Sequence, residues 1–215
     1  MGETLDQNVQ IAILGAGLSS RLGYPKQLLL FRGEPLISRI TREASCISNA
    51  KIFVVTGAYR DEVVKALEGQ TYYEIWNKNF TLGIGASLRC LRDTLFRVGS
   101  SKNPLLIIAC DQIFIDKSVI RDLLTRYWDD IYRRGLQKRF AVVCDYGATL
   151  GLPAVLSPSL WEDLGSLKDT EGAKKIWHSS DVHLGTISCP QAQWDIDTRE
   201  DCKIHGIQHS FLGND

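Results

Sequence analysis

Short apolar runs alternate with amphipathic stretches over most of the sequence. The most apolar run, residues 104–110, is hydrophobic at nearly every position, which is typical of a strand that is buried on both faces. Strands of this kind, separated by helices, predict a mostly parallel sheet covered by helices. We therefore expect an α/β, Rossmann-like fold with a twisted sheet flanked by helices.

The pattern places strands at residues 9–14, 51–56, 72–76, 104–110, 140–144, 153–156 and 182–188. It places helices at residues 35–47, 60–67, 85–98 and 118–134, with helical stretches near Trp161 and Ala173 and a final helix after Thr198. No repeat or linker divides the chain, so we expect a single domain over residues 1–215. Ligands bind such sheets at the carboxyl ends of the strands, so the residues that follow each strand are the first functional candidates.

Charge and cysteine content exclude several classes of function. The 25 basic and 25 acidic residues balance, which gives no general electrostatic reason to bind nucleic acid or an anionic membrane. No segment is long and apolar enough to span a bilayer, and the N-terminus is polar and acidic. The six cysteines never adopt C-x-x-C spacing, and Cys110 and Cys144 lie in apolar runs, which favours reduced, buried thiols and a cytoplasmic location.

The segment after the first expected strand suits a phosphate-binding loop. Glycines let backbone N–H groups approach an anion, and basic side chains neutralise it. A Walker loop requires a lysine directly after its last glycine, but Tyr24 follows Gly23, so that type of loop is excluded. A dinucleotide-binding loop and a plain glycine-rich turn stay open as alternatives. The candidate nucleotide-binding residues here are Leu14, Gly15, Ala16, Gly17, Ser19, Ser20, Arg21 and Lys26.

Three aspartates are candidate metal ligands. Asp111 follows the buried run 104–110, where a carboxylate is costly unless it is solvated, binds a cation or caps the next helix. Asp195 and Asp197 are two residues apart and share one face of an extended segment, where a cation between them would relieve their repulsion. Helix capping by Asp197 or Thr198 is the alternative, because Thr198 is the first residue of a Thr-x-x-Asp capping box.

A third segment combines Asn77, Gly83 and Ser87 ahead of and within an expected helix. Glycines at this position permit close approach of a nucleotide base or ribose, and a plain helix start is the alternative.

These motifs together resemble the MobA-like nucleotidyltransferases. Residues 14–26 fit the signature L-x-[AG]-G-x-[SG]-x-R-[ML]-G-x-[PD]-K, residues 77–88 fit N-x-x-[WF]-x-x-G-[MI]-x-x-S-L, and residues 195–201 are similar to D-I-D-T-x-E-D. Residues 111–113 match the family's D-Q-P except that Ile113 replaces the proline. The resemblance extends over about residues 9–202.

The resemblance implies a fold of the nucleotide-diphospho-sugar transferase type and a Mg²⁺-dependent transfer of a nucleoside monophosphate to a phosphorylated acceptor. Arg21 and Lys26 would contact the phosphates of a nucleoside triphosphate, and Asp111 would hold the Mg²⁺; these three are the expected catalytic residues. Ala16 and Pro25 favour CTP over GTP. The implied partners are the nucleoside triphosphate, a molybdopterin-type cofactor and a molybdoenzyme that receives the product.

Departures from the family pattern fall in the half expected to meet the acceptor. Leu152 stands in Gly-Leu-Pro where relatives usually have Gly-His-Pro, and Asp169 and Thr170 replace the usual Gly-Asp of L-x-G-D-x-G-A. Transfer of a guanylyl group, transfer to a sugar phosphate or phospholactate, and a non-catalytic accessory protein that binds the molybdenum cofactor therefore stay open as alternatives.

Overall fold

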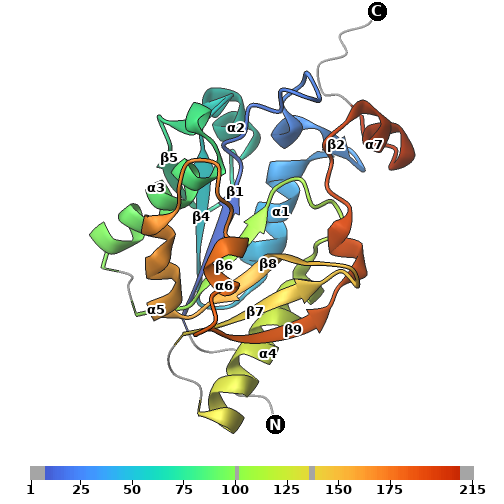
Figure 1. The fold of residues 1–215 in the computed structure, drawn as a ribbon. Helices are drawn as coiled ribbons and strands as arrows, with labels where there is room; N and C mark the ends of the chain where they lie inside the picture. The colour runs from blue at the N-terminus through green and yellow to red at the C-terminus, as the bar shows by residue number, and fades with distance from the viewer. Residues whose placement is uncertain (1–7, 100–101, 136–138, 209–215) are drawn as a thin grey trace, which may run out of the picture.

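A seven-stranded sheet runs through the computed structural model, which describes residues 8–99, 102–135 and 139–208 (Figure 1). The strand order is β5-β4-β1-β6-β8-β7-β9, and a separate two-stranded ribbon pairs β2 with β3. The strands are β1 (Val9–Leu14), β2 (Leu30–Phe31), β3 (Glu34–Pro35), β4 (Ala50–Thr56), β5 (Tyr73–Trp76), β6 (Leu105–Ala109), β7 (Phe140–Asp145), β8 (Leu150–Leu156) and β9 (His183–Ser188).

The sheet is parallel except for one strand. β1 pairs in parallel with β4 and β6, and β7 pairs in parallel with β9. β8 lies antiparallel between β6 and β7, so its amino end reaches the edge where the other strands have their carboxyl ends. The predicted α/β fold with a mostly parallel sheet is confirmed. The prediction of one domain over residues 1–215 stays a prediction, since both ends of the chain lie outside the described residues.

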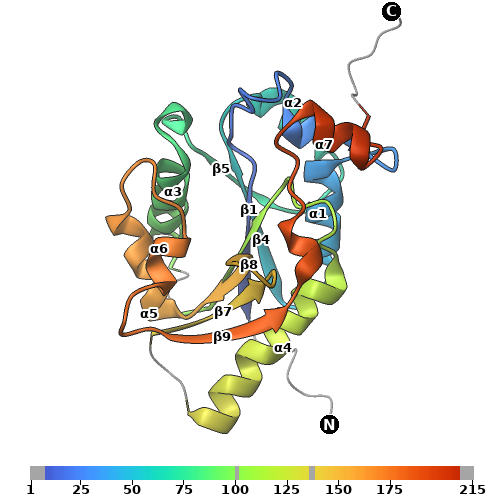
Figure 2. The ribbon, with the colours of Figure 1, turned by 45° about the vertical axis from the view of Figure 1, so that its right-hand side comes forward.

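Helices cover both faces of the sheet. In Figure 2, α1 and α4 lie on one side of the strands, and α3, α5 and α6 lie on the other. The helices are α1 (Leu36–Ser45), α2 (Arg60–Ala66), α3 (Ile84–Arg97), α4 (Lys117–Arg134), α5 (Pro158–Trp161), α6 (Lys174–Trp177) and α7 (Arg199–Ile204), with short 3-10 turns η1 (Lys26–Leu28), η2 (Phe80–Leu82), η3 (Glu162–Ser166) and η4 (Pro190–Gln193). The predicted helices and strands are confirmed within a few residues.

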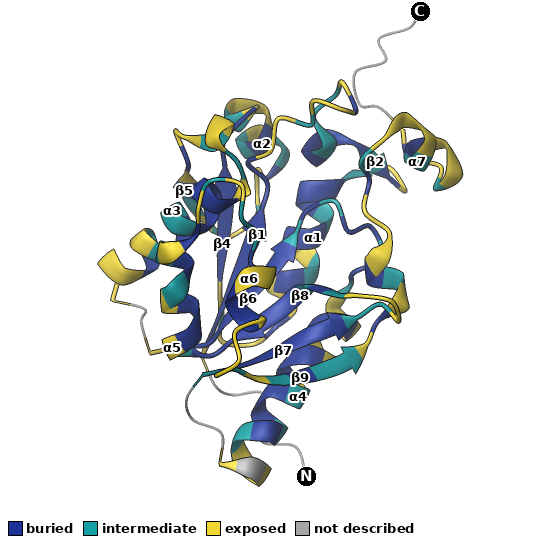
Figure 3. Ribbon diagram, viewed as in Figure 1, coloured by how far each residue is buried: buried dark blue, intermediate teal, exposed yellow. Residues whose placement is uncertain are grey.

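Two apolar layers make up the main core. Ile11 and Ile13 of β1 pack in the layer under α1 and α4, whereas Ala12 and Leu14 pack in the layer under α3. This alternation follows from the two-residue period of a strand, and both sets are buried because helices cover both faces (Figure 3). A third apolar cluster, which includes Ile196, ties the segment after β9 to the loop after β1.

The cysteines are free thiols, and Cys110 and Cys144 are buried, as predicted. Across the part of the chain that the structure describes, the helices lack the combination of length and apolar character that a membrane span requires.

The segment after η3 packs against the beginning of α3. The Gly85 N–H donates to the Asp169 carbonyl oxygen at 2.8 Å, and the Arg89 guanidinium donates to the Leu167 carbonyl and pairs with the Asp169 carboxylate. A Cβ atom at Gly85 would lie closer than 3.0 Å to the Lys168 carbonyl oxygen, a distance that real Cβ contacts essentially never show. Gly85 is therefore required for this backbone-to-backbone contact.

We expect Gly85→Ala to lower the free energy of unfolding by about 1–3 kcal/mol, because the added methyl group overpacks the contact with Lys168 by more than alanine's helix propensity offsets. Urea denaturation measures the effect. Gly172→Ala is the matched control, since a Cβ there meets nothing within 4 Å, and its stability should change by less than about 0.5 kcal/mol. Equal stability of the two variants would contradict the packing assigned to Gly85.

Candidate active site

A cavity of about 570 Å³ opens at the edge of the sheet where the parallel strands end. Its lining comes from the loop after β1, the residues after β6, η2 and the start of α3, the β7–β8 hairpin, the start of α6, and the chain from η4 to Asp195. The lining residues are Leu14, Gly15, Ala16, Gly17, Leu18, Lys26, Gln27, Phe80, Thr81, Gly83, Ile84, Ser87, Ala109, Cys110, Asp111, Gln112, Tyr146, Leu152, Lys174, Ala192, Gln193 and Asp195.

The glycine-rich loop forms the first wall of the cavity. The Gly15 N–H donates to the Val55 carbonyl at 3.0 Å, and the Lys26 N–H closes the loop by donating to Ser19 Oγ at 3.1 Å. The loop leads into the three-residue turn η1 and not into an α-helix. A dinucleotide-binding loop opens directly into a helix that carries its pyrophosphate, so that alternative is wrong for this chain.

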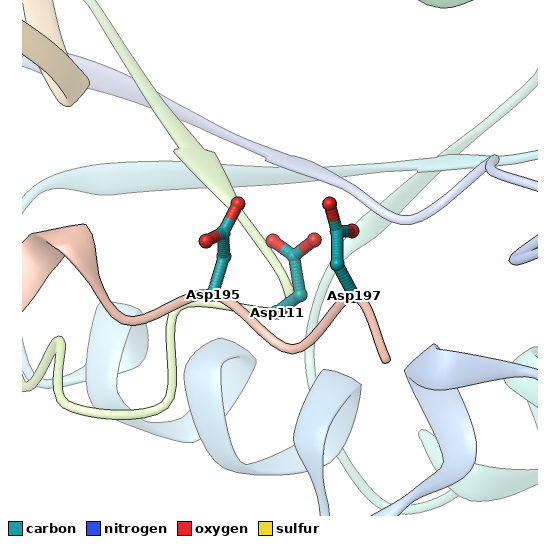
Figure 4. A group of neighbouring side chains, drawn as sticks. All are labelled: Asp111, Asp195 and Asp197. Atoms are coloured by element: carbon teal, nitrogen blue, oxygen red, sulfur yellow. The ribbon is translucent and has the colours of Figure 1, made fainter. Parts of the chain in front are cut away.

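Asp111, Asp195 and Asp197 form an acid cluster, of which Asp111 and Asp195 line the cavity and Asp197 lies beside them, outside the lining. Figure 4 shows the three carboxyl groups side by side, with Asp111 directly after β6 and the other two on the chain that follows η4. Each offers an oxygen atom, and these atoms lie within 4.8 Å of one another. A backbone bridge between Gln112 and Asp195 and a hydrogen bond from the Ile196 N–H to the Asp111 carbonyl, at 3.3 Å, hold the two segments together.

Other residues perform the helix capping that was the alternative role for these acids. Asp116 caps α4, accepting hydrogen bonds from Ser118 and Val119. Thr198 caps α7 in a capping box completed by Asp201. Asp111, Asp195 and Asp197 are thus not used as caps, although the predicted capping box is present.

Lys26 lies between two of the acids. Its ammonium nitrogen is 2.6 Å from Asp111 Oδ2 and 2.8 Å from Asp197 Oδ1, and its side chain is 16% exposed. Desolvation disfavours the ammonium, but the charges of Asp111 and Asp197 outweigh it and raise the pKa of Lys26. Arg21 also pairs with Asp197, at 2.6 Å, from a position that is 74% exposed.

The acids themselves differ in their ionisation. Desolvation, followed by the charge of Asp111, raises the pKa of Asp195 above its ordinary value. Desolvation also opposes ionisation of Asp197, but hydrogen bonds and charge from Lys26 and Arg21 overcome it and lower the pKa of Asp197. The two carboxyl groups therefore share a site but respond to different neighbours.

The structure brings most of the predicted nucleotide-binding residues to the cavity. Those that line it are Leu14, Gly15, Ala16, Gly17, Lys26, Gly83 and Ser87. Ser19, Ser20, Arg21 and Asn77 are outside the lining; Asn77 is buried behind Ser87 and donates to its hydroxyl at 3.0 Å.

Gly83 has a packing role in addition to its place in the lining. A Cβ atom there would lie 2.5 Å from the Asp169 carbonyl oxygen, and its φ of 125° is one that side chains rarely adopt.

Another wall of the cavity was predicted only in part, because Leu152 was expected in the half that meets the acceptor but Tyr146 and Gln193 were not singled out. Tyr146, Leu152 and Gln193 belong to it, and the Gln112 amide joins it together by donating to the carbonyls of Leu152 at 2.7 Å and Ala192 at 2.8 Å. Tyr146 directly follows β7, and that position could have identified it. Leu152 could not be found in this way, because it reaches the site only as part of an antiparallel strand.

The acid cluster fits a divalent cation. Carboxylate oxygens are the ligands that Mg²⁺ and Mn²⁺ prefer, and three carboxylates close together need a cation for charge balance. Lys26 supplies part of that charge in the structure.

A family model described as "MobA-like NTP transferase domain" matches residues 11–184. No curated protein matches the chain at a significant level.

Several solved structures share the fold. Rv0371c from Mycobacterium tuberculosis H37Rv is 23% identical with a TM-score of 0.71, covering 92% of this chain and 97% of that one; its complex with manganese is also similar, with a TM-score of 0.66 at 22% identity, covering 93% of this chain and 98% of that one. A nucleotidyl transferase from Methanothermobacter thermautotroptrophicus, Mth528, is 20% identical with a TM-score of 0.73, covering 93% and 97% of the two chains. Molybdopterin-guanine dinucleotide biosynthesis protein A from Archaeoglobus fulgidus is 15% identical with a TM-score of 0.65, covering 92% and 96%.

We expect Lys26→Met to raise the affinity for Mn²⁺ in the absence of nucleotide by roughly tenfold or more, because it removes a positive charge from between two of the carboxylates. Titration of free Mn²⁺, followed by its electron paramagnetic resonance signal, measures the affinity. Lys78→Met, which removes an ammonium that lies over the Trp76 ring, is the control and should bind Mn²⁺ as the wild type does. An unchanged affinity in Lys26→Met would contradict the proposed competition between the lysine and a metal ion.

The opposite pKa shifts predict opposite effects on stability at pH 7. Folding disfavours the ionised form of Asp195, a cost present above its raised pKa, so Asp195→Asn should stabilise the protein. Ionised Asp197 contributes stability that is present above its ordinary pKa of 3.8 and lost as the pH falls through its lowered value, so Asp197→Asn should destabilise it. Each change should be about 1 kcal/mol or less.

Thermal unfolding at a series of pH values measures both effects. The Asp195→Asn difference from wild type should shrink as the pH falls towards 3.8, the ordinary pKa of aspartate, whereas the Asp197→Asn difference should persist to that pH and shrink only below it. Shifts of the same sign at pH 7 would show that the two carboxyl groups do not experience the different environments described above.

Proposed function

The chain belongs to the MobA-like NTP transferase family, and from that membership we propose that it transfers CMP from CTP to the phosphate of a molybdopterin-type cofactor and releases pyrophosphate. One observation carries the proposal: a glycine loop, Lys26 and two aspartates, Asp111 and Asp195, line a single cavity, and Asp197 completes a three-carboxylate cluster with them. A nucleoside triphosphate is a polyanion that requires both cationic groups and an acid-held metal ion.

The glycine loop and Lys26 would hold the triphosphate. Ala16 and Gly17 line the cavity together with Lys26, and backbone N–H groups of such a loop would suit several phosphate oxygens at once. Once phosphates are present, the Lys26 ammonium can exchange its contacts with Asp111 and Asp197 for contacts with the nucleotide. Arg21 stands at the outer side of Asp197 and can add a further positive charge.

Asp111, Asp195 and Asp197 would hold Mg²⁺. The bound ion would supply charge neutralisation at the transferring phosphoryl group. The manganese complex of Rv0371c supports a divalent ion in a protein of the same fold.

The chemistry needs no covalent intermediate with the protein. An oxygen of the acceptor phosphate forms a bond to the α-phosphorus, and the bond from that phosphorus to the bridging oxygen of pyrophosphate breaks. The role of the chain is to align the two substrates and to stabilise the negative charge on the transferring group with Lys26 and Arg21.

The acceptor would contact the wall that contains Tyr146, Leu152 and Gln193. The aromatic ring and the apolar side chain suit a flat ring system such as a pterin, and the fold neighbour from Archaeoglobus fulgidus is titled as a molybdopterin-guanine dinucleotide biosynthesis protein. The CTP assignment rests on Ala16 and Pro25 of the loop motif. A molybdoenzyme would receive the product, and the free thiols fit a cytoplasmic location.

A pyrophosphate-release assay tests the proposal, with each of the four common ribonucleoside triphosphates against molybdopterin and a panel of phosphorylated acceptors. We expect release only from CTP with molybdopterin and Mg²⁺. Asp111→Asn should reduce the rate by at least about 100-fold because it removes a charge that holds the ion, with an unfolding temperature close to that of the wild type. Asp93→Asn, which changes an exposed acid paired with Arg92, is the control and should be fully active.

Each other outcome identifies an alternative. Release from GTP would overturn the choice of nucleotide, and release with a sugar phosphate or phospholactate would overturn the acceptor. An absence of release from every nucleotide would favour a non-catalytic accessory protein that binds the molybdenum cofactor.

A further inference from the structure

Gln27 lies directly behind the glycine loop. It belongs to η1 and is fully buried. Its side-chain amide nitrogen donates to the carbonyl oxygen of Gly15 and to that of Gly17, each at 2.8 Å. Its Cγ atom is also among the nearest neighbours of the position that a Cβ on Gly15 would occupy, at 3.8 Å. One side chain thus binds the loop at two points.

These hydrogen bonds occupy carbonyl groups of the loop and leave several of its N–H groups without an acceptor. The carbonyl oxygen of Ala16 accepts from the Ala58 N–H at 3.1 Å, so the carbonyls of three consecutive residues, 15 to 17, are all occupied by the protein. Within residues 8–99, 102–135 and 139–208, the N–H groups of Ala16, Gly17 and Leu18 have no acceptor. All three residues line the cavity, so the donors of the loop are left for a ligand.

The second polar atom of Gln27 indicates that this arrangement is retained at a cost. Its Oε1 atom is buried and has no hydrogen-bond partner among the residues that the structure describes. A buried acceptor without a partner is destabilising, and leucine or methionine would fill similar space without that atom. The presence of an amide at this position is explained by its two N–H groups, which bind the carbonyl oxygens of Gly15 and Gly17.

We propose that Gln27 is a positioning residue that holds the glycine loop in the conformation in which it presents its N–H groups to a polyphosphate. Lys26, in the same turn, supplies a positive charge to the cavity, whereas the Gln27 amide fixes the conformation of the loop through its two hydrogen bonds. This inference rests on the proposed function in that the natural ligand would be the triphosphate of a nucleotide. The preorganisation it describes should change polyphosphate affinity and leave the acid cluster as it is.

Calorimetric titration with inorganic tripolyphosphate tests this role, with Gln27→Leu and Gln27→Glu as variants. Leucine removes both donors, and glutamate of the same shape places an acceptor against two carbonyl oxygens. We expect the dissociation constant for tripolyphosphate to rise about tenfold in Gln27→Leu and further in Gln27→Glu. Mn²⁺ affinity without polyphosphate should stay within about twofold of wild type in both variants, which a general loss of structure would not allow.

Gln70→Leu is the matched control. The Gln70 amide also donates to a backbone carbonyl, that of Ser38, and its Oε1 atom is also buried with no partner in the described part of the chain, but Gln70 lies outside the cavity lining. This variant should bind tripolyphosphate as the wild type does. Unchanged affinity in Gln27→Leu, or no binding of tripolyphosphate by the wild type, would overturn the inference. Binding that is weakened in the Gln27 variants would support it even if no pyrophosphate release is found with any nucleotide, a result that would count against the proposed function alone.

Discussion

The ammonium of Lys26, placed between Asp111 and Asp197, is the interaction on which the site depends. It joins three segments that are far apart in the sequence: the loop after β1, the end of β6 and the chain after η4. Three neighbouring carboxylates would repel one another without a cation among them. The apolar cluster that includes Ile196 holds the chain after η4 in place. Although the chain has zero net charge, its acidic and basic side chains are gathered locally, with Lys26 and Arg21 facing three aspartates at this site.

The sequence was sufficient to predict the sheet and the charged centre of the site. Asp111 could be found because it follows the most apolar strand, and Lys26 because it closes a glycine-rich loop; both positions follow from where parallel strands end. The direction of β8 could not be predicted, since an apolar run has the same pattern in either direction, so Leu152 was singled out only through its departure from the family pattern. Side-chain direction could not be predicted either: the Asn77 amide is buried and donates to the Ser87 hydroxyl, and its nucleotide-binding role stays a prediction.

Gln27 and Gly85 show why local patterns also mislead. Gln27 stands next to an apolar run, where a glutamine gives no signal, and only the folded loop reveals that its amide meets two carbonyl groups. Gly85 belongs to a pair of glycines that suggested close approach of a nucleotide, yet the atom that approaches it is the Lys168 carbonyl oxygen. In both cases the contact that determines which residue type fits the position is made with a residue that is distant in the sequence. Tertiary packing creates such contacts, so local sequence patterns do not reveal them.

The reversal of β8 divides the construction of the cavity into two parts. The wall with Lys26 and the aspartates depends on β1, β6 and the chain after η4, whereas Tyr146 and Leu152 lie at the two sides of the hairpin that connects β7 to β8. The hairpin turn, closed by the hydrogen bond from the Tyr146 N–H to the Thr149 carbonyl, is at the rim and not inside the core. Its length and side chains can therefore vary without any change in the register of the parallel strands, so one half of the cavity can evolve new selectivity while the other keeps its chemistry.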